Sequence, residues 1–191
     1  MGETVLSRAL IGHDGMIKKL GLVLAGSIIV AIAAQFSIGW PVPMSLQGLA
    51  VLIIGFTYGS KLASATLVTY LAYGAMGLPV FSNGRALEAL AGPQSWTAGF
   101  LYGFVMMAFI AGLAADRGLT RNVLAMSLVG IVASLLLYVP GLLWPALLLG
   151  VEWADLWTKW MLPFLLGDTI KAVVAAMIVW GGWKAVTNRS A

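Results

Sequence analysis

Stretches of apolar residues long enough to cross a lipid bilayer recur along this chain. Charged residues make up only 9% of the 191 residues and hydrophobic ones 61%, whereas a soluble domain carries about 25% charged residues. The apolar stretches, separated by turns rich in Gly and Pro, cover residues 19–39, 45–58, 60–77, 97–115, 122–140 and 160–183. The sequence therefore predicts an all-α integral membrane protein in which residues 1–191 form a single membrane domain. Six transmembrane helices are expected within 19–183, and residues 1–17 are expected to form an amphipathic interfacial stretch.

Most of the basic residues fall on one side of this six-helix arrangement. Eight of the 11 are Arg8, Lys18, Lys19, Lys61, Arg117, Arg121, Lys184 and Arg189. Because cytoplasmic segments of membrane proteins are enriched in Lys and Arg, this pattern predicts that both termini are cytoplasmic. Topology accounts for these charges, so no nucleic-acid partner is expected. Six tryptophans fall near the opposite side, as in an aromatic belt.

The sequence lacks the residues that several kinds of enzyme require. It has no G-x-x-x-x-G-K-[ST] loop for nucleotide phosphates, no cysteine, and a single histidine, His13, in the N-terminal stretch. Metalloprotease and nucleophile–histidine chemistry within the membrane is therefore excluded. The sequence predicts a protein that is not an enzyme and that has neither a metal site nor a cofactor.

Two charged residues interrupt the last apolar stretch. Asp168 and Lys171 stand three positions apart and so share one helix face. They are expected roughly 10–12 Å below the outer end of their helix. Charged residues at membrane depth commonly mark functional sites. From the spacing alone, an internal ion pair between helices and the floor of a ligand cavity remain equally open.

Two further segments carry polar residues near the predicted outer side. Gln47 follows a Pro-rich break and has no local role in its helix, so it is expected to be buried with a partner or to contact a ligand. The loop Gly77-Leu-Pro-Val-Phe-Ser-Asn-Gly84-Arg85 is long enough to be functional. Its Asn83-Gly84 step is also explained by a simple turn.

Four motifs in this order give the sequence a family resemblance. They are Pro43-Met-Ser-Leu-Gln47, Gly77-Leu-Pro-Val-Phe81, Gly92-Pro93 with a following Gly-Phe, and Gly167-Asp168-x-x-Lys171. Over residues 25–182 the chain resembles the BioY family, the biotin-specific substrate-binding (S) components of energy-coupling factor (ECF) transporters. The resemblance implies an S-component-like bundle in the bacterial cytoplasmic membrane, with biotin as its ligand. A transmembrane coupling (T) protein and two ABC-type ATPases would be its partners, which agrees with the missing nucleotide loop.

The resemblance also implies which residues contact the ligand. Family residues of the biotin pocket correspond to Asn83, Asp168 and Lys171. The family's Gly-Pro-Thr-Gly-Gly-Tyr motif is altered here, where the chain reads Gly92-Pro-Gln-Ser-Trp-Thr-Ala-Gly99-Phe100. Arg85 is then the nearest alternative partner for the biotin carboxylate. The aromatic residues expected to surround the apolar ring, each also explained as core or lipid-facing, are Tyr73, Phe81, Trp96 and Phe100.

The first helix carries small residues, among them the small-xxx-small pair Ser27 and Ala31. Such pairs permit close approach of membrane helices. Packing within the protein is one explanation, and the resemblance favours docking on the T protein. A self-sufficient secondary transporter or channel with Asp168 as an ion or proton site is the alternative function, although no inverted repeat is evident.

Overall fold

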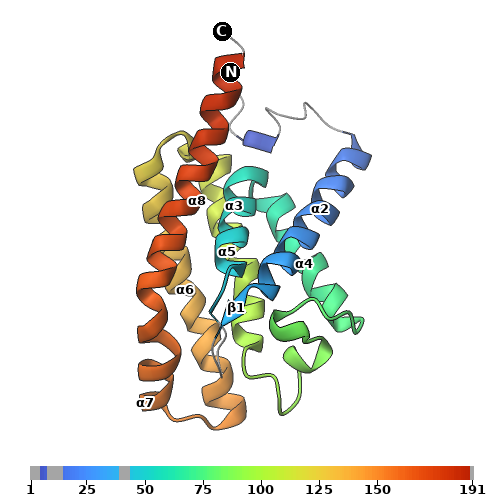
Figure 1. Cartoon of the computed structure of the whole chain (residues 1–191), viewed down its shortest axis with the longest axis vertical. Helices are drawn as coiled ribbons and strands as arrows, with labels where there is room; N and C mark the ends of the chain where they lie inside the picture. The colour runs from blue at the N-terminus through green and yellow to red at the C-terminus, as the bar shows by residue number, and fades with distance from the viewer. Residues whose placement is uncertain (1–4, 8–14, 39–43, 190–191) are drawn as a thin grey trace.

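The computed structural model describes residues 5–7, 15–38 and 44–189 and consists mainly of helices joined by short connections (Figure 1). Two two-residue strands, β1 (Ser37–Ile38) and β2 (Met44–Ser45), pair antiparallel after the first long helix. The long helices are α2 (Met16–Gln35), α3 (Gln47–Tyr58), α4 (Ser60–Ala75), α5 (Ala98–Asp116), α6 (Val123–Leu149) and α8 (Leu162–Arg189). The short helical turns are η1 (Ser82–Gly84), η2 (Leu87–Ala89), η3 (Leu119–Arg121), α7 (Trp153–Asp155) and the π-helical η4 (Leu156–Met161). Each of the six predicted apolar stretches thus overlaps one long helix.

Several helix ends differ from the prediction, among them the end of α8, which lies at Arg189 and not at residue 183. The first helix was expected to reach residue 39 but ends at Gln35, because the chain turns there into the β1–β2 pair. The fifth was expected to end at residue 140, yet α6 continues through Pro140 and Pro145 to Leu149. Prolines are tolerated within membrane helices because neighbouring groups satisfy the freed backbone carbonyls.

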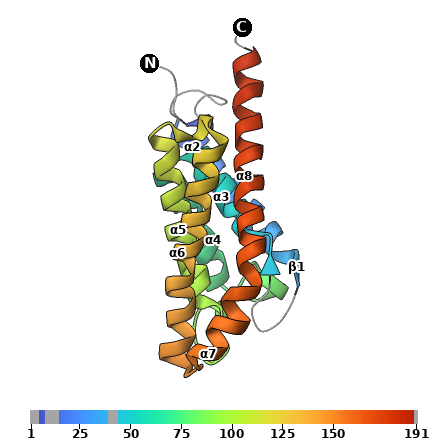
Figure 2. The ribbon, with the colours of Figure 1, turned by 90° about the vertical axis from the view of Figure 1, so that its left-hand side faces the viewer.

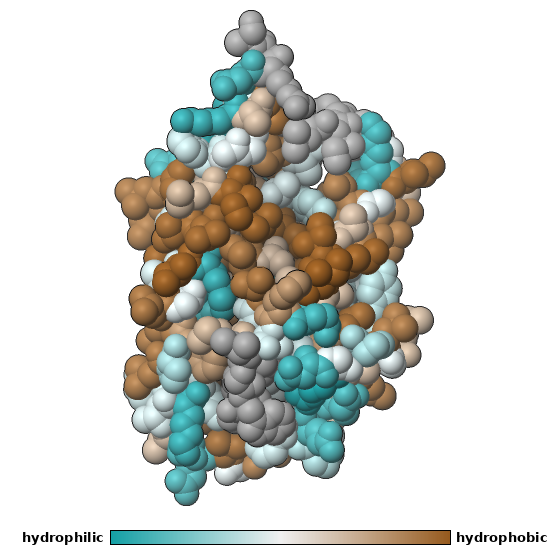
Figure 3. All heavy atoms as spheres, in the orientation of Figure 1, coloured by the Kyte–Doolittle hydropathy of each residue, from teal (hydrophilic) through white to brown (hydrophobic). Residues whose placement is uncertain are grey.

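Four of the helical segments are long and apolar enough to cross a membrane. They are α2, α5, α6 and the continuous run Trp153–Asn188 that joins α7, η4 and α8. The shorter α3 has 12 residues and α4 has 16, which correspond to about 18 and 24 Å of helix. Figure 3 shows hydrophobic side chains across the middle of the molecule and hydrophilic ones gathered toward its two ends.

Helix α5 forms the centre of the bundle and packs against α3, α4 and α6. Glycines permit this close approach. A Cβ on Gly112 would lie 2.4 Å from the Cα of Ser60, and a Cβ on Gly99 would lie 2.0 Å from the carbonyl oxygen of Pro140. Helix α8 lies beside α6 and α3 and extends beyond the rest of the bundle (Figure 2).

Residues 5–7 lie at the same end of the molecule as the C-terminal turns of α8, and α7 and the loop after α4 lie at the opposite end (Figure 1). Val5 and Leu6 are buried, with exposures of 1% and 4%, and Leu6 approaches Gly182 of α8. Residues 5–7 therefore pack their side chains against this end of the bundle, and the interfacial stretch stays a prediction. The rest of 1–14 lies outside the described residues.

Candidate ligand-binding site

One cavity is lined by segments from across the chain: β2 and the start of α3, the loop after α4, and helices α5, α6 and α8. Its polar lining consists of Ser45, Gln47, Ser82, Arg85, Thr97, Ser134, Tyr138, Asp168 and Lys171. A largely apolar pocket with a few placed polar groups is typical of small-molecule sites.

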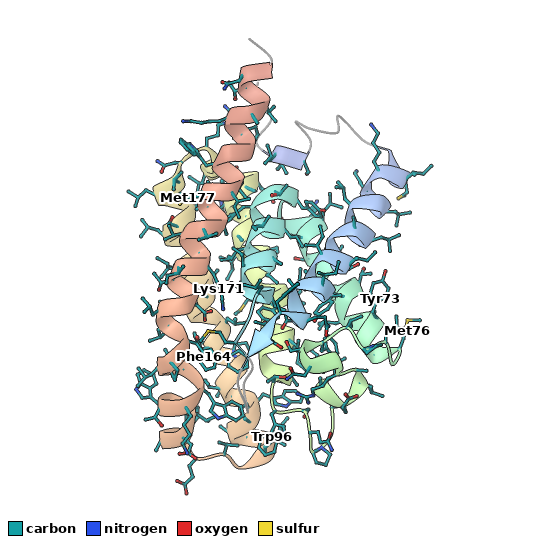
Figure 4. The ribbon with its side chains drawn as sticks, viewed as in Figure 1. Tyr73, Met76, Trp96, Phe164, Lys171 and Met177 are labelled. Atoms are coloured by element: carbon teal, nitrogen blue, oxygen red, sulfur yellow. The ribbon has the colours of Figure 1, made fainter. Side chains whose placement is uncertain are left out.

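Three residues of α6 and α8 form what we call the charged wall: Tyr138, Asp168 and Lys171. The Lys171 ammonium donates to Asp168 Oδ1 at 2.9 Å, and the Tyr138 hydroxyl donates to Asp168 Oδ2 at 2.6 Å. Their i, i+3 spacing places the acid and the base on the face of α8 that points inward, as Lys171 does in Figure 4. The side chains of Lys171 and Asp168 are only 15% and 19% exposed. Through Tyr138 the pair joins α8 to α6, and it also lines the cavity. An ion pair between helices and the floor of a ligand cavity, the two explanations of its spacing, are therefore compatible.

A second part of the lining, which we call the neutral wall, consists of Ser45, Gln47 and Ser82. Gln47 is 4% exposed, and its Oε1 accepts from the hydroxyls of Ser45 and Ser82, each at 2.9 Å. Its Nε2 donates to the Tyr70 hydroxyl at 2.8 Å. Gln47 is thus both buried with partners and exposed to the cavity at one edge. The network connects α3 and α4 to the loop that follows α4.

Arg85 supplies a second cation to the cavity, from the loop after α4. The Phe81 amide donates to the Arg85 carbonyl at 3.0 Å, and the Arg85 guanidinium donates to the carbonyl of Gln94. Burial lowers the pKa of Arg85 from its ordinary value, and nearby Glu88 counteracts this. The guanidinium nevertheless stays charged at neutral pH. Since Asp168 and Lys171 neutralise each other, the described lining carries a net positive charge and favours an anionic group near Arg85.

Two of the four predicted aromatic residues line the cavity. Phe81 is 1% exposed and packs edge-on against Tyr70, with ring centroids 5.2 Å apart. Phe100 meets Tyr138 edge-on at 5.9 Å. Both rings present apolar surface close to the polar groups.

The structure does not bring three other predicted ligand residues to the cavity. Asn83 adopts a left-handed backbone conformation (φ 62°), and its Oδ1 accepts from Ser37 at the exposed edge of β1. Trp96 packs against Trp160, with ring centroids 6.4 Å apart, and borders a separate surface hollow. Tyr73 is half-buried and lies on the side of α4 away from the cavity (Figure 4), whereas Tyr70 of the same helix faces inward.

Several polar lining residues were not predicted. Ser45, Ser82 and Tyr138 are each common in turns or helices and carry no signal of their own. Tyr138 stands 30 positions before Asp168, so only the packing of α6 on α8 reveals their contact. Ser82 could have been identified from its place in the loop, because it stands next to the predicted ligand residue Asn83.

The two residues of the predicted docking pair on α2 differ in burial. Ser27 is 0% exposed, and a Cβ on its neighbour Gly26 would lie 2.8 Å from Thr66 of α4. The prediction that Ser27 docks on a partner is therefore wrong, because this face of α2 packs against α3 and α4. Ala31 is half-buried and packs beside the core.

Comparison with known proteins identifies relatives over most of the chain. The sequence profile of the BioY family matches residues 5–188. A biotin transporter BioY from Rhizobium etli is 36% identical over 169 residues, covering 81% of this chain and 87% of that protein. A biotin transporter BioY from Thermotoga maritima is 34% identical over 165 residues, covering 82% and 92%. A probable biotin transporter BioY from Pyrococcus horikoshii is 33% identical over 163 residues, covering 84% and 93%.

A solved structure shares the fold. The crystal structure of the S-component for biotin from an ECF-type ABC transporter superposes with a TM-score of 0.76 at 22% identity. The match covers 88% of this chain and 92% of that one. The helical arrangement in Figure 1 is thus that of a known S component.

Proposed function

Because the chain belongs to the BioY family, we propose that it captures biotin and takes it up across the cytoplasmic membrane as the substrate-binding component of an ECF-type transporter. The observation that carries this proposal is the cavity with its Asp168–Lys171 pair, in a chain matched by the family over residues 5–188. Among the described lining residues Asp168 is the sole carboxylate, and it already accepts from two donors. This arrangement favours a hydrogen-bonding ligand over a coupling cation.

The proposed pose follows from the chemistry of the two ends of biotin. Its cyclic urea has two N–H donors and one carbonyl acceptor, which suit the Asp168 carboxylate and the Lys171 ammonium. Its carboxylate suits the guanidinium of Arg85, which bonds such groups in a planar, bidentate manner. The thioether ring would then lie between the rings of Phe81 and Phe100. No resident cofactor takes part in capture under this proposal.

We place both termini on the cytoplasmic side, with all six long helices within the membrane. The proximity of residues 5–7 to the end of α8 supports this orientation, and so does the excess of Lys and Arg in the connections at that end. The loop after α4 and α7 would then face outward, where biotin enters.

Energy for uptake would come from partners, namely a T protein and two ABC-type ATPases. The absence of a phosphate-binding loop from the sequence agrees with this division of labour. Ala31 remains a predicted contact for the T protein, without Ser27.

The function is tested by calorimetric titration of the purified protein with biotin, without nucleotide or added ions. We expect saturable binding of biotin and none of thiamine or riboflavin, which lack a cyclic urea joined to an alkyl carboxylate. No heat of binding with folded protein, or flux that requires a proton or sodium gradient, would contradict the proposal.

The topology is tested by cysteine labelling, since the chain has no native cysteine. Ala91 and Arg117 are exposed at opposite ends of the bundle. A membrane-impermeant maleimide added outside intact cells should modify Ala91→Cys and spare Arg117→Cys. The opposite labelling would place the termini outside.

A further inference from the structure

The neutral wall contains a chain of hydrogen bonds whose direction is fixed from one end. The Tyr70 hydroxyl donates its only proton to the backbone carbonyl of Val80 at 3.1 Å. A carbonyl oxygen can only accept, so no other arrangement of that bond exists. The Tyr70 oxygen can therefore only accept from its other neighbour, Gln47.

This constraint fixes the side-chain amide of Gln47. Its Nε2 must be the atom that faces Tyr70, at 2.8 Å, which leaves Oε1 facing Ser45 and Ser82. Because Oε1 is also only an acceptor, both serine hydroxyls must donate to it. The proton of each hydroxyl is thus committed within the wall, away from the cavity.

The two serines then differ in the hydrogen-bonding capacity that their hydroxyl oxygens retain. The Ser45 oxygen also accepts from the Gln47 backbone amide at 3.3 Å, which occupies one of its lone pairs. The residue Ser82 is 7% exposed, and it lines the cavity. With its proton committed to Gln47, Ser82 can offer the cavity lone pairs and no donor.

We propose that Tyr70 and Gln47 are positioning residues that set Ser82 as a hydrogen-bond acceptor, and that Ser82 thereby selects ligands with a second N–H group. This inference rests on the proposed function and extends it to specificity. A cyclic urea has two N–H donors, and the carboxylate of the charged wall is placed to accept one of them. The neutral wall offers an acceptor for the other from a different part of the same cavity.

Tyr70 provides the test because it does not line the cavity and is 0% exposed. Without its hydroxyl, in Tyr70→Phe, the Gln47 amide is free to rotate by 180° and donate to the serines. The Ser82 proton then turns toward the cavity and opposes a ligand N–H. We expect biotin affinity to fall roughly two- to tenfold, as for the loss of one neutral hydrogen bond.

A double-mutant cycle separates ordering from general damage. Ser82→Ala should lower biotin affinity by a similar factor, and adding Tyr70→Phe to it should lower affinity no further. Tyr102→Phe is the matched control, since that tyrosine donates to the Leu90 carbonyl at 3.0 Å and lies outside both the cavity and this network. Its biotin affinity should equal that of the unchanged protein. If Tyr70→Phe does not fold, Gln47→Met removes the same ordering and takes its place in the cycle.

Biotins methylated on one or the other ureido nitrogen give a second readout that stability does not affect. The unchanged protein should reject both isomers. Ser82→Ala and Tyr70→Phe should each relax rejection of the same single isomer. Additive effects in the cycle, or unchanged rejection of both isomers in Ser82→Ala, would overturn the inference. Failure of the unchanged protein to bind biotin at all would instead refute the proposed function.

Discussion

The charged wall and the neutral wall line the same cavity, yet they are built on different principles. In the charged wall, α8 carries an acid and a base within one turn, and Tyr138 of α6 fixes the acid. In the neutral wall, no member is charged, and Gln47 distributes three hydrogen bonds among β2, α4 and the following loop. Under the proposed function the first wall would supply charged hydrogen bonds to the ligand, whereas the second would supply a hydroxyl whose proton direction is fixed.

The difference has an energetic basis. Hydrogen bonds to charged groups contribute about 1.5–3 kcal/mol, against about 0.5–1.5 kcal/mol for neutral ones. A charge without its partner is costly at low exposure, so changes to the charged wall should lower affinity more than changes to the neutral wall. Each of the following experiments can break or sharpen that ranking.

The largest effect is expected for Lys171→Met. This change removes a donor to the ligand and leaves the Asp168 carboxylate without its cation in a site where it is only 19% exposed. Loss of one partner from a buried pair lowers folding stability by about 3–5 kcal/mol. Loss of the charged donor to the ligand should lower biotin affinity to the upper end of a roughly ten- to hundredfold range. The measurement is calorimetry on variants first shown to be folded and monodisperse.

Asp168→Asn is the companion variant and should cost less. It keeps the shape of the side chain, replaces one acceptor oxygen with a donor, and should reduce affinity roughly ten- to hundredfold. If both variants lose thermal stability but bind biotin normally, the pair is purely structural and the charged wall has no part in binding.

The sequence predicted the acid and the base of the charged wall because charges within an apolar helix are conspicuous. Asp168 and Lys171 are expensive in hydrocarbon, and their spacing put them on one helix face, as the structure confirms. The six apolar stretches likewise predicted the six long helices, since each is bounded by Gly or Pro. Gln47 was predicted to be buried with a partner because its helix gave it no local role, and this too is confirmed.

The remainder of the site depends on contacts that no local pattern encodes. Tyr73 was predicted to surround the apolar ring, yet the tyrosine of α4 that faces inward is Tyr70, whose ring packs against Phe81. Asn83 looked like a ligand residue, but its left-handed backbone turns it toward Ser37. Small residues on α2 permitted both internal packing and docking, and the position of α4 buries Ser27.

The next prediction concerns Arg85, the cation that belongs to neither wall. Arg85→Gln should reduce biotin affinity about tenfold, less than a fully buried charged bond, because the residue is partly exposed. Biotin amide, which lacks the anionic carboxylate, should bind the unchanged protein and Arg85→Gln equally well. Equal losses for biotin and its amide would show that Arg85 supports the loop through Gln94 and does not bind the carboxylate.

Tyr138→Phe should have a smaller effect, and it compares the walls directly with Tyr70→Phe. Each variant removes one hydroxyl that fixes a polar group, Asp168 in one case and Gln47 in the other. Asp168 keeps its bond to Lys171, so we expect a loss of roughly three- to tenfold in biotin affinity. Calorimetry of both variants under one condition gives the ranking, and a larger loss for Tyr70→Phe would reverse it.

The smallest effect on affinity is expected far from both walls, at Ser27 on α2. Leucine there must fit a face that is fully buried and lies beside the contact of Gly26 with Thr66. Overpacking of this kind costs about 1–3 kcal/mol, so thermal unfolding in detergent should shift to lower temperature. Biotin affinity of the folded fraction should stay within about twofold, since α2 does not line the cavity. Ser27→Ala is the control, because the hydroxyl bonds only to the carbonyl of Leu24 in its own helix and its removal adds no bulk. Normal stability in Ser27→Leu, together with lost association with the T protein, would show that this face of α2 opens to a partner after all.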